Sequence, residues 1–144
     1  MTSFEGDAEL VAAVQDADSA SWAVRAAAGR RLAVAAEVPK IAEVLRRLLL
    51  DAHDTGVVHE TAEALLQRGD LWGLRAVLAA LGRAEDSSVA DQLAAEVDCD
   101  PRWLSGTSGG SAFFRQLEVL AADPDEIVGT EAQRLLARLS APEG

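Results

Sequence analysis

Two histidines and the acidic residues near them are the side chains of this sequence with the most obvious chemistry. His59 and Glu60 open a segment that matches the first half of the zinc-helix motif H-E-x-x-H, in which two histidines one turn apart bind the metal. The second histidine is missing, although Glu63 could ligate in its place with His53 nearby. We nevertheless predict no metal site and no cofactor, because position 59 falls where a repeat described below places an exposed cation.

A second motif lies at residues 106–110, where Gly-Thr-Ser-Gly-Gly satisfies the nucleophile pattern G-x-S-x-G. That pattern works when a turn between a strand and a helix strains the serine outward over a sheet, and no strand is expected before it. Both histidines lie far upstream in segments with helical periodicity, so neither is placed to activate the serine. We therefore predict a flexible connection, no catalytic residues, and a protein that is not an enzyme.

Cys99, the only cysteine, lies between Asp98 and Asp100. The two negative charges disfavour the thiolate that nucleophilic attack requires, so we expect an inert thiol. The acidic pair lacks the glycine, the further oxygen ligands and the closing glutamate of an EF-hand loop, so a solvated loop is expected rather than a calcium site. A single cysteine also excludes an internal disulfide, which fits a reducing compartment.

The size and charge of the chain restrict its partners. Its 144 residues, 49% of them hydrophobic, suffice for one globular domain with its own core. The formal net charge of −11 opposes binding to phosphate backbones and to anionic lipids, so we expect no nucleic acid and no membrane partner. Neither a hydrophobic span nor a signal peptide is recognised, which predicts a cytoplasmic protein, and the preference for arginine over lysine suggests a bacterial source.

The spacing of apolar residues predicts an all-α fold of about eight helices. Apolar side chains recur every three or four residues through most of the chain, and its abundance of alanine and leucine favours helix over strand. Pro101 and several glycines interrupt this period and predict a long loop over 98–110. The predicted helices, which form a single core over about 7–139, are 7–17, 19–36, 39–52, 54–69, 70–82, 88–97, 111–120 and 123–139.

Residues typical of helix ends place most of these boundaries. Polar side chains such as serine and aspartate satisfy the free N–H groups at a helix start. Gly69 is expected to end its helix in the left-handed conformation, which glycine adopts without steric cost, and Gly82 is expected to be a second helix stop. The expected start signals are Asp7, Ser19 or Ser21, Pro39, Asp54 or Thr55, Asp70, the capping box of Ser88 and Asp91, Ser111, and Asp123 with Pro124.

A pattern of three residues spaced by four recurs along the chain at intervals of roughly 30 to 40 residues. Each copy follows an acidic turn, where a carboxylate meets the positive end of a helix dipole. A small middle residue lets a neighbouring helix approach closely, and large residues on the partner helix fill the layer between pairs. The pattern predicts stacked helix pairs, and its copies are Val24-Ala28-Leu32, Val58-Ala62-Leu66, Val89-Leu93-Val97 and Val128-Ala132-Leu136.

These residues resemble HEAT-type repeats, in particular the short bacterial kind with the pattern D-x-x-x-V-R-x-x-A-x-x-x-L. Val24, Arg25 and Ala28 match that pattern and residues 123–128 match its opening, whereas His59 replaces the arginine of the second copy and the third copy is degenerate. The resemblance implies a right-handed α-α superhelix, a solenoid, and an irregular helical bundle is the alternative. It places the helices at 39–52, 70–82 and 111–120 on the concave face and those at 19–36, 54–69, 88–97 and 123–139 on the convex one.

Members of this family mostly bind other proteins, so the resemblance implies a non-enzymatic protein-binding module. Two runs of charge bear on its partner, because residues 25–50 carry a local net charge of +4 and residues 84–101 one of −6. In a solenoid the second run forms an acidic surface that would steer a basic partner, as in an immunity protein that sequesters a basic toxin. Solubility alone is the other explanation of that run.

The tryptophans supply candidate anchors for such a partner. Trp22 precedes a periodic core position and is expected to be buried, whereas Trp72 lies off the apolar stripe of its helix and is expected to be partly exposed. Exposed aromatics anchor in pockets, arginines pair with carboxylates, and aspartates steer by charge. The predicted partner-binding residues are Arg47, Trp72, Arg75 and Arg115 from the inner helices, with Asp98, Asp100 and Trp103 from the loop.

Two alternative functions follow from the same sequence. HEAT-like scaffolds also occur in nucleic-acid-binding and DNA-repair proteins, and the basic run over 25–50 is the support for that hypothesis, which the overall charge opposes. A self-associating structural module is the other alternative, because the helices carry alanine-rich apolar faces. We expect a monomer or a weak homo-oligomer.

Overall fold

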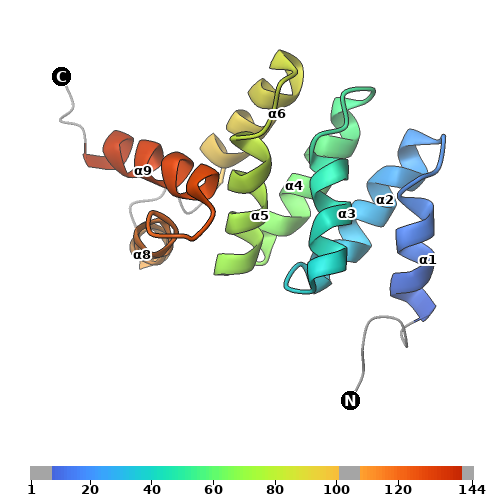
Figure 1. Cartoon of the computed structure of the whole chain (residues 1–144), viewed down its shortest axis with the longest axis horizontal. Coiled ribbons are helices and arrows are strands. Elements are labelled where there is room, and N and C mark those ends of the chain that lie inside the picture. The colour runs from blue at the N-terminus through green and yellow to red at the C-terminus, as the bar shows by residue number, and fades with distance from the viewer. Residues whose placement is uncertain (1–7, 101–107, 141–144) are drawn as a thin grey trace.

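The computed structural model describes residues 8–100 and 108–140, and its described part contains eight α-helices, one short 3-10 helix and no strand. The predicted all-α fold and its eight helices are therefore confirmed (Figure 1). Within the described residues, no helix has the length and apolar character needed to cross a membrane. The helices are α1 (Ala8–Asp16), α2 (Trp22–Leu32), η2 (Ala33–Ala35), α3 (Pro39–Leu49), α4 (Thr55–Gln67), α5 (Leu71–Leu81), α6 (Ser87–Asp98), α8 (Ser108–Leu120) and α9 (Glu126–Ser140).

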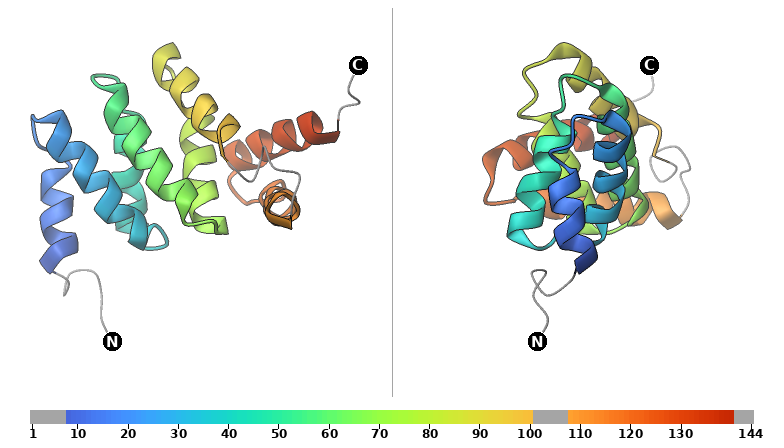
Figure 2. Two further views of the ribbon diagram at one scale, coloured as in Figure 1. Left: turned by 180° about the vertical axis from the view of Figure 1, so that it is seen from behind. Right: turned by 90° about the vertical axis from the view of Figure 1, so that its right-hand side faces the viewer.

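The first six helices stack as antiparallel neighbours in two layers. α1, α3 and α5 form one layer, and α2, α4 and α6 form the other, as the front and back views show (Figures 1 and 2). Within the layers α2 packs on α4, α4 packs on α6, and α3 packs on α5. α1 lies at one end of the long axis and α8 with α9 at the other, so sequence order follows spatial order.

The last helix leaves this arrangement. The sequence placed α9 in the layer of α2, α4 and α6, but α9 packs against α5 and α8 instead. Gly82, just after α5, permits this contact, because a Cβ at that position would lie 2.3 Å from Ile127 Cγ2 of α9. The missing side chain lets α9 settle on the end of α5, and the predicted layer order is wrong for this helix.

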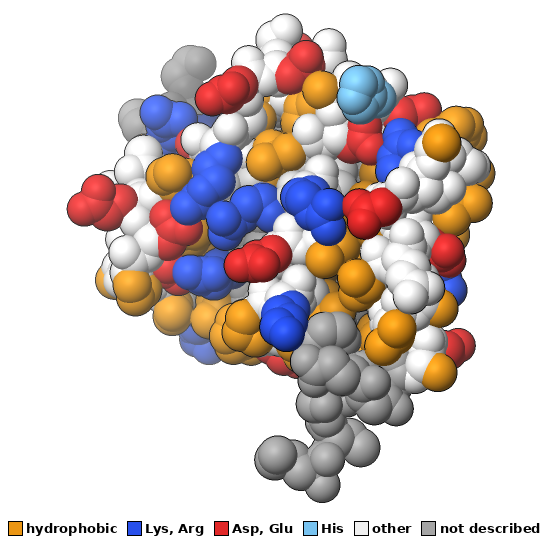
Figure 3. Space-filling view, turned by 45° about the vertical axis from the view of Figure 1, so that its right-hand side comes forward, with side chains coloured by type: hydrophobic (Ala, Val, Ile, Leu, Met, Phe, Trp, Pro, Cys, Tyr) orange, Lys and Arg blue, Asp and Glu red, His pale blue; other side chains and the backbone are white. Residues whose placement is uncertain are grey.

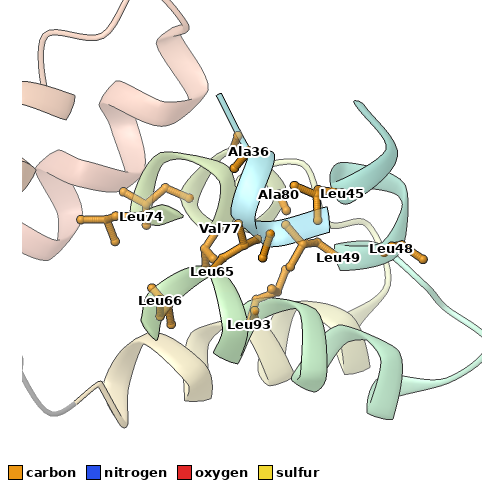
Figure 4. Close-up of a cluster of buried hydrophobic side chains, with 14 of the residues drawn as sticks. Ala36, Leu45, Leu48, Leu49, Leu65, Leu66, Leu74, Val77, Ala80 and Leu93 are labelled. Carbon is orange, nitrogen blue, oxygen red and sulfur yellow. The ribbon is translucent and has the colours of Figure 1, made fainter. Parts of the chain in front are cut away.

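Large leucines between the layers form the core. Leu45 and Leu49 of α3, Leu65 of α4 and Leu74 of α5 belong to one cluster of buried side chains (Figure 4). Each such leucine contributes about 1.5–3 kcal/mol relative to an exposed one. Small residues lie at the contact between α2 and α4, so the two helix backbones approach each other closely. The buried small residues at that contact are Ala28, Gly29 and Ala62.

Polar side chains at the helix starts confirm several predicted boundaries. Ser21, Asp54 and Asp70 are the N-caps of α2, α4 and α5, and each accepts a hydrogen bond from a backbone N–H of the first turn. Pro39 is the first residue of α3, as predicted. Gly69 has a φ of +71°, so the predicted left-handed end of α4 is confirmed as well. The predicted cap Asp7 lies outside the described residues.

Other predicted boundaries are wrong. Asp86, rather than Ser88, caps α6, because its carboxylate accepts from two backbone N–H groups and starts the helix one residue earlier. Ser111 lies inside α8, which begins at Ser108, and α6 continues to Asp98, so the predicted loop over 98–110 is shorter at both ends. Its residues 101–107 lie outside the described residues. Gly82, by contrast, is the C-cap of α5 as predicted, with a φ of −72° in the right-handed region.

The start of the last helix also differs from the prediction. α9 begins at Glu126, and the Asp125 carboxylate accepts from Ile127 N at 3.0 Å, so the helix starts later than the predicted pair Asp123 with Pro124. Asp123 instead accepts from the backbone N–H of Asp125 at 2.9 Å and shapes the turn before the helix.

Candidate functional site

Arginines in or just after a helix pair with acidic residues in or next to a turn along most of the stack. Arg25 Nε donates to Asp51 Oδ2 at 2.9 Å, and both side chains are largely buried. The turns before α2, α4 and α9 therefore hold guanidinium groups as well as helix starts. The further pairs of this kind are Arg31 with Asp16, Arg47 with Asp18, Arg75 with Asp123 and Arg83 with Asp125.

The predicted contact residues of the inner helices do not form one surface. Arg47 lies near the end of α3 and pairs with Asp18 of the α1–α2 turn at 3.0 Å. Trp72 lies at the start of α5, on the opposite edge of the stack (Figure 1). Trp72 is 48% exposed, which agrees with the exposure expected for it. Arg115 is exposed on α8, as a contact residue must be.

Arg75 is engaged inside the fold. Its Nε and Nη2 donate to the two carboxylate oxygens of Asp123 at 2.8 and 2.9 Å, which ties α5 to the turn before α9. The hydrogen bond from Arg75 is the main reason that the pKa of Asp123 lies below its ordinary value. This guanidinium is committed to an internal ion pair, so it does not present a free charge to a partner.

Of the two acidic residues near the end of α6, Asp100 is buried and Asp98 keeps 44% of its side chain exposed. Asp100 is only 4% exposed, which contradicts its predicted role as a steering charge at the surface. Asp98 Oδ1 lies 3.1 Å from Arg138 Nη1 of α9. The predicted contact residue Trp103 lies outside the described residues.

Trp22 is more exposed than predicted, whereas Asp100 is more buried. The sequence placed Trp22 in the core, but 53% of it is exposed. It is the first residue of α2, and a Cβ at Gly56 would lie 3.6 Å from its ring. The indole therefore covers the start of α4 from outside instead of entering the layer between the helices.

A pocket of about 680 Å³ lies against α4 and the C-terminal half of α6. It is in the layer of α2, α4 and α6, away from the predicted inner face. Buried Asp100 and exposed Cys99 lie at one part of its wall. The pocket is lined by His59, Glu63, Leu66, Gln67, Gly69, Gln92, Ala95, Glu96, Cys99 and Asp100.

His59 is the centre of a cluster of charged groups in this pocket. Its Nδ1 lies 2.6 Å from Glu96 Oε2, and its Nε2 lies 3.6 Å from Glu63 Oε2. The hydrogen bond with Glu96 is the main reason that the pKa of His59 lies above its ordinary value, and burial opposes it. The exposed cation predicted at position 59 is in fact a half-buried imidazole that links α4 to α6.

The same cluster contains the residues that could hold a metal. One ligand atom each from His59, Glu63 and Glu96 lies within 4.8 Å of the other two. Sequence reasoning considered Glu63 as a ligand but missed Glu96, which lies in α6. The third copy of the sequence pattern indicates that the helix carrying Glu96 packs beside α4. Because that copy is degenerate, it does not fix the register between the two helices.

Neither a family model, nor a curated protein, nor a solved structure matches this chain. Its function is therefore inferred from its own residues and fold.

Proposed function

We propose that this chain is a HEAT-like repeat module, a right-handed solenoid that binds another protein without catalysing a reaction. The exposed indole of Trp72 is the observation that carries the proposal. Tryptophan is enriched among the residues that dominate binding energy at interfaces, and Trp72 keeps 48% of its surface exposed. The phased repeat, the two stacked layers and the paired acidic turns support the HEAT-like architecture.

The backbone around Trp72 is held in place before any partner binds. Asp70 caps α5 and accepts from Gly73 N at 3.0 Å, and it also takes hydrogen bonds from Arg68. Arg68 Nη1 in turn donates to the carbonyl of Ala33 at 2.7 Å. This contact brings the α2–α3 turn beside the α4–α5 turn, so the exposed side chain of Val34 lies on the same edge as Trp72. We call this edge, defined by Val34 and Trp72, the turn edge.

A rigid apolar turn edge suits a protein partner. Preorganised side chains lose little conformational entropy on binding, so more of the contact energy appears as affinity. The net charge of −11 favours a basic partner, and a cation of that partner could stack on the exposed indole. An immunity or sequestering protein that covers a basic toxin has these properties.

Binding to nucleic acid is the less favoured function. Arg25, Arg30, Arg31 and Arg47, four of the six basic residues in the run over 25–50, already pair with carboxylates. On the face in Figure 3, Arg and Lys side chains gather with Asp and Glu side chains among them. A groove that neutralises phosphates needs free positive charge, which such pairing reduces. Self-association through the turn edge is the other alternative.

The proposal is tested by comparing Trp72→Ala with Trp22→Ala. Both tryptophans are about half exposed, but Trp22 lies at the α1–α2 turn on the opposite edge, so it serves as a matched control. Proteins captured from the native cell by the unmodified chain are identified and purified, and their affinities for both variants are measured by calorimetry. Circular dichroism verifies that both variants are folded.

We expect Trp72→Ala to weaken binding of the captured protein at least about tenfold and Trp22→Ala to leave it unchanged. An equal affinity of both variants for every captured protein would refute the placement of the interface at the turn edge. Saturable binding of duplex DNA in a gel-shift titration would favour the nucleic-acid function, and a concentration-dependent mass in sedimentation would favour self-association.

A further inference from the structure

We propose that His59, Glu63 and Glu96 form a binding site for one divalent transition-metal ion, of which Zn²⁺ is the best fit. The site lies in the pocket between α4 and α6 and is independent of the protein-binding turn edge. Its ligands would come from two helices, so an ion bound there would join adjacent repeats.

The geometry of the three side chains suits a small cation. Their ligand atoms lie within 4.8 Å of one another. Ligands of a tetrahedral Zn²⁺, with bonds of about 2.0–2.1 Å, stand roughly 3.3 Å apart. Glu96 Oε2 lies 2.6 Å from Nδ1 of His59 and Glu63 Oε2 lies 3.6 Å from its Nε2, so rotation of the side chains must bring both carboxylates to the nitrogen that binds the ion.

The α4 helix itself sets two of these ligands on one face. His59 and Glu63 are four residues apart, a spacing that places side chains one above the other. Arg30 binds Oε1 of Glu63 and leaves Oε2 directed toward His59. Gln92 Nε2 donates to Glu96 Oε2 at 2.6 Å, which fixes the third carboxylate from the same helix. Such outer contacts orient metal ligands before the ion arrives.

The net charge of the groups around His59 is negative enough to be balanced by a divalent cation. The carboxylates of Glu60, Glu63 and Glu96 all act on the imidazole, and Arg30 is the guanidinium paired with two of them. With a neutral imidazole, the three carboxylates and the guanidinium carry a net charge of −2. A divalent ion neutralises this charge in a half-buried setting, where unbalanced charge is costly.

The pocket is the second observation in favour of the site. A hollow of about 680 Å³ reaches the three side chains, so an ion can enter and water can complete its coordination. Three protein ligands with an open position is the arrangement of zinc sites that bind a further ligand. The mixed nitrogen and oxygen donors favour Zn²⁺, Co²⁺ or Ni²⁺ over Ca²⁺ and Mg²⁺, which prefer oxygen alone.

The test is a titration of Zn²⁺ into chelator-treated, untagged protein, followed by isothermal calorimetry. The variants are His59→Gln and Glu96→Gln, and the control is His53→Gln, which removes the other histidine of the chain. His53 is exposed in the α3–α4 turn and is not part of the cluster. Circular dichroism of each variant before titration verifies that its helices are intact.

We expect one Zn²⁺ per chain, at least about tenfold weaker binding by His59→Gln and by Glu96→Gln, and unchanged binding by His53→Gln. In ¹⁵N spectra of the unmodified protein labelled at histidine, Zn²⁺ should shift the ring nitrogens of His59 and not those of His53. This spectrum keeps the proposal testable if a variant fails to fold. Absence of saturable binding, or equal perturbation of the two histidine rings, would overturn it.

Discussion

Gly29 of α2 lies directly against Thr61 of α4, and a Cβ at position 29 would stand 2.1 Å from Thr61 Oγ1. Thr61 is fully buried, so it has no free space into which it could move. We expect Gly29→Ala to lower the free energy of unfolding by about 1–3 kcal/mol through overpacking. The higher helix propensity of alanine offsets about 1 kcal/mol of this loss. Urea denaturation followed by circular dichroism measures the change.

A double variant distinguishes this clash from a general effect on α2. Thr61→Ala removes Oγ1, so Gly29→Ala should cost less in the Thr61→Ala background than in the unmodified chain. If the two substitutions are additive, the close approach of Gly29 and Thr61 does not limit the packing of α2 on α4.

Alanine variants of Asp86 and Ser88 test which of the two residues is the N-cap of α6. The Asp86 carboxylate accepts hydrogen bonds from Ser88 N at 2.9 Å and from Val89 N at 3.2 Å. Asp86→Ala should therefore lower the free energy of unfolding by about 1 kcal/mol. Ser88→Ala should change it by less than about half of that, since Ser88 lies within the helix and is exposed. The reverse order in urea denaturation would contradict this N-cap.

The helices could be predicted because their apolar residues repeat with the period of a helix. Leu74 and Leu78, for example, lie one turn apart on the face of α5 that is buried. The exact ends could not all be predicted, because Asp86 and Ser88 both offer an oxygen at a suitable distance from the first turn. Only the backbone geometry decides which of the two caps the helix.

Contacts between helices distant in the chain could not be predicted from the sequence. His59 and Glu96 are 37 positions apart in the chain but form a hydrogen bond. Their local sequence pattern does not fix the register of α4 against α6. Asp100 appeared in a run of acidic residues that suggests a solvated surface, yet it is buried. Trp22 sits beside a periodic position, but its place at the very start of α2 leaves its ring outside the core.

Gly69 has a φ of +71° and would tolerate a side chain only at a conformational cost. No atom lies within 4 Å of a Cβ built at this position, so the cost of a substitution comes from the backbone alone. Gly69→Ala should lower the free energy of unfolding by about 1–2 kcal/mol. Gly69→Asn should lower it less, because asparagine enters the left-handed region more readily. Equal losses for the two variants in urea denaturation would argue against a backbone origin.

The ion pair between Arg75 and Asp123 should make stability depend on pH in acid. Hydrogen bonds from Arg75 hold the pKa of Asp123 below its ordinary value in the folded protein. The unfolded chain therefore binds a proton at this carboxyl more readily than the folded chain does. The stabilisation by the pair is fully present above the unfolded pKa, about 3.9, and is lost as the pH falls through the lower folded pKa.

Arg75→Gln tests this dependence, with Arg115→Gln as the control because Arg115 is an exposed arginine on α8. At pH 7 Arg75→Gln should lower the free energy of unfolding by about 1–2 kcal/mol, a range that allows for partial exposure of the guanidinium. The difference from the unmodified protein should shrink between about pH 4 and pH 2 as Asp123 becomes protonated. Arg115→Gln should differ little at any pH. A difference for Arg75→Gln that stays constant from pH 7 to about pH 2 would mean that Arg75 stabilises the fold by packing, not by its charge.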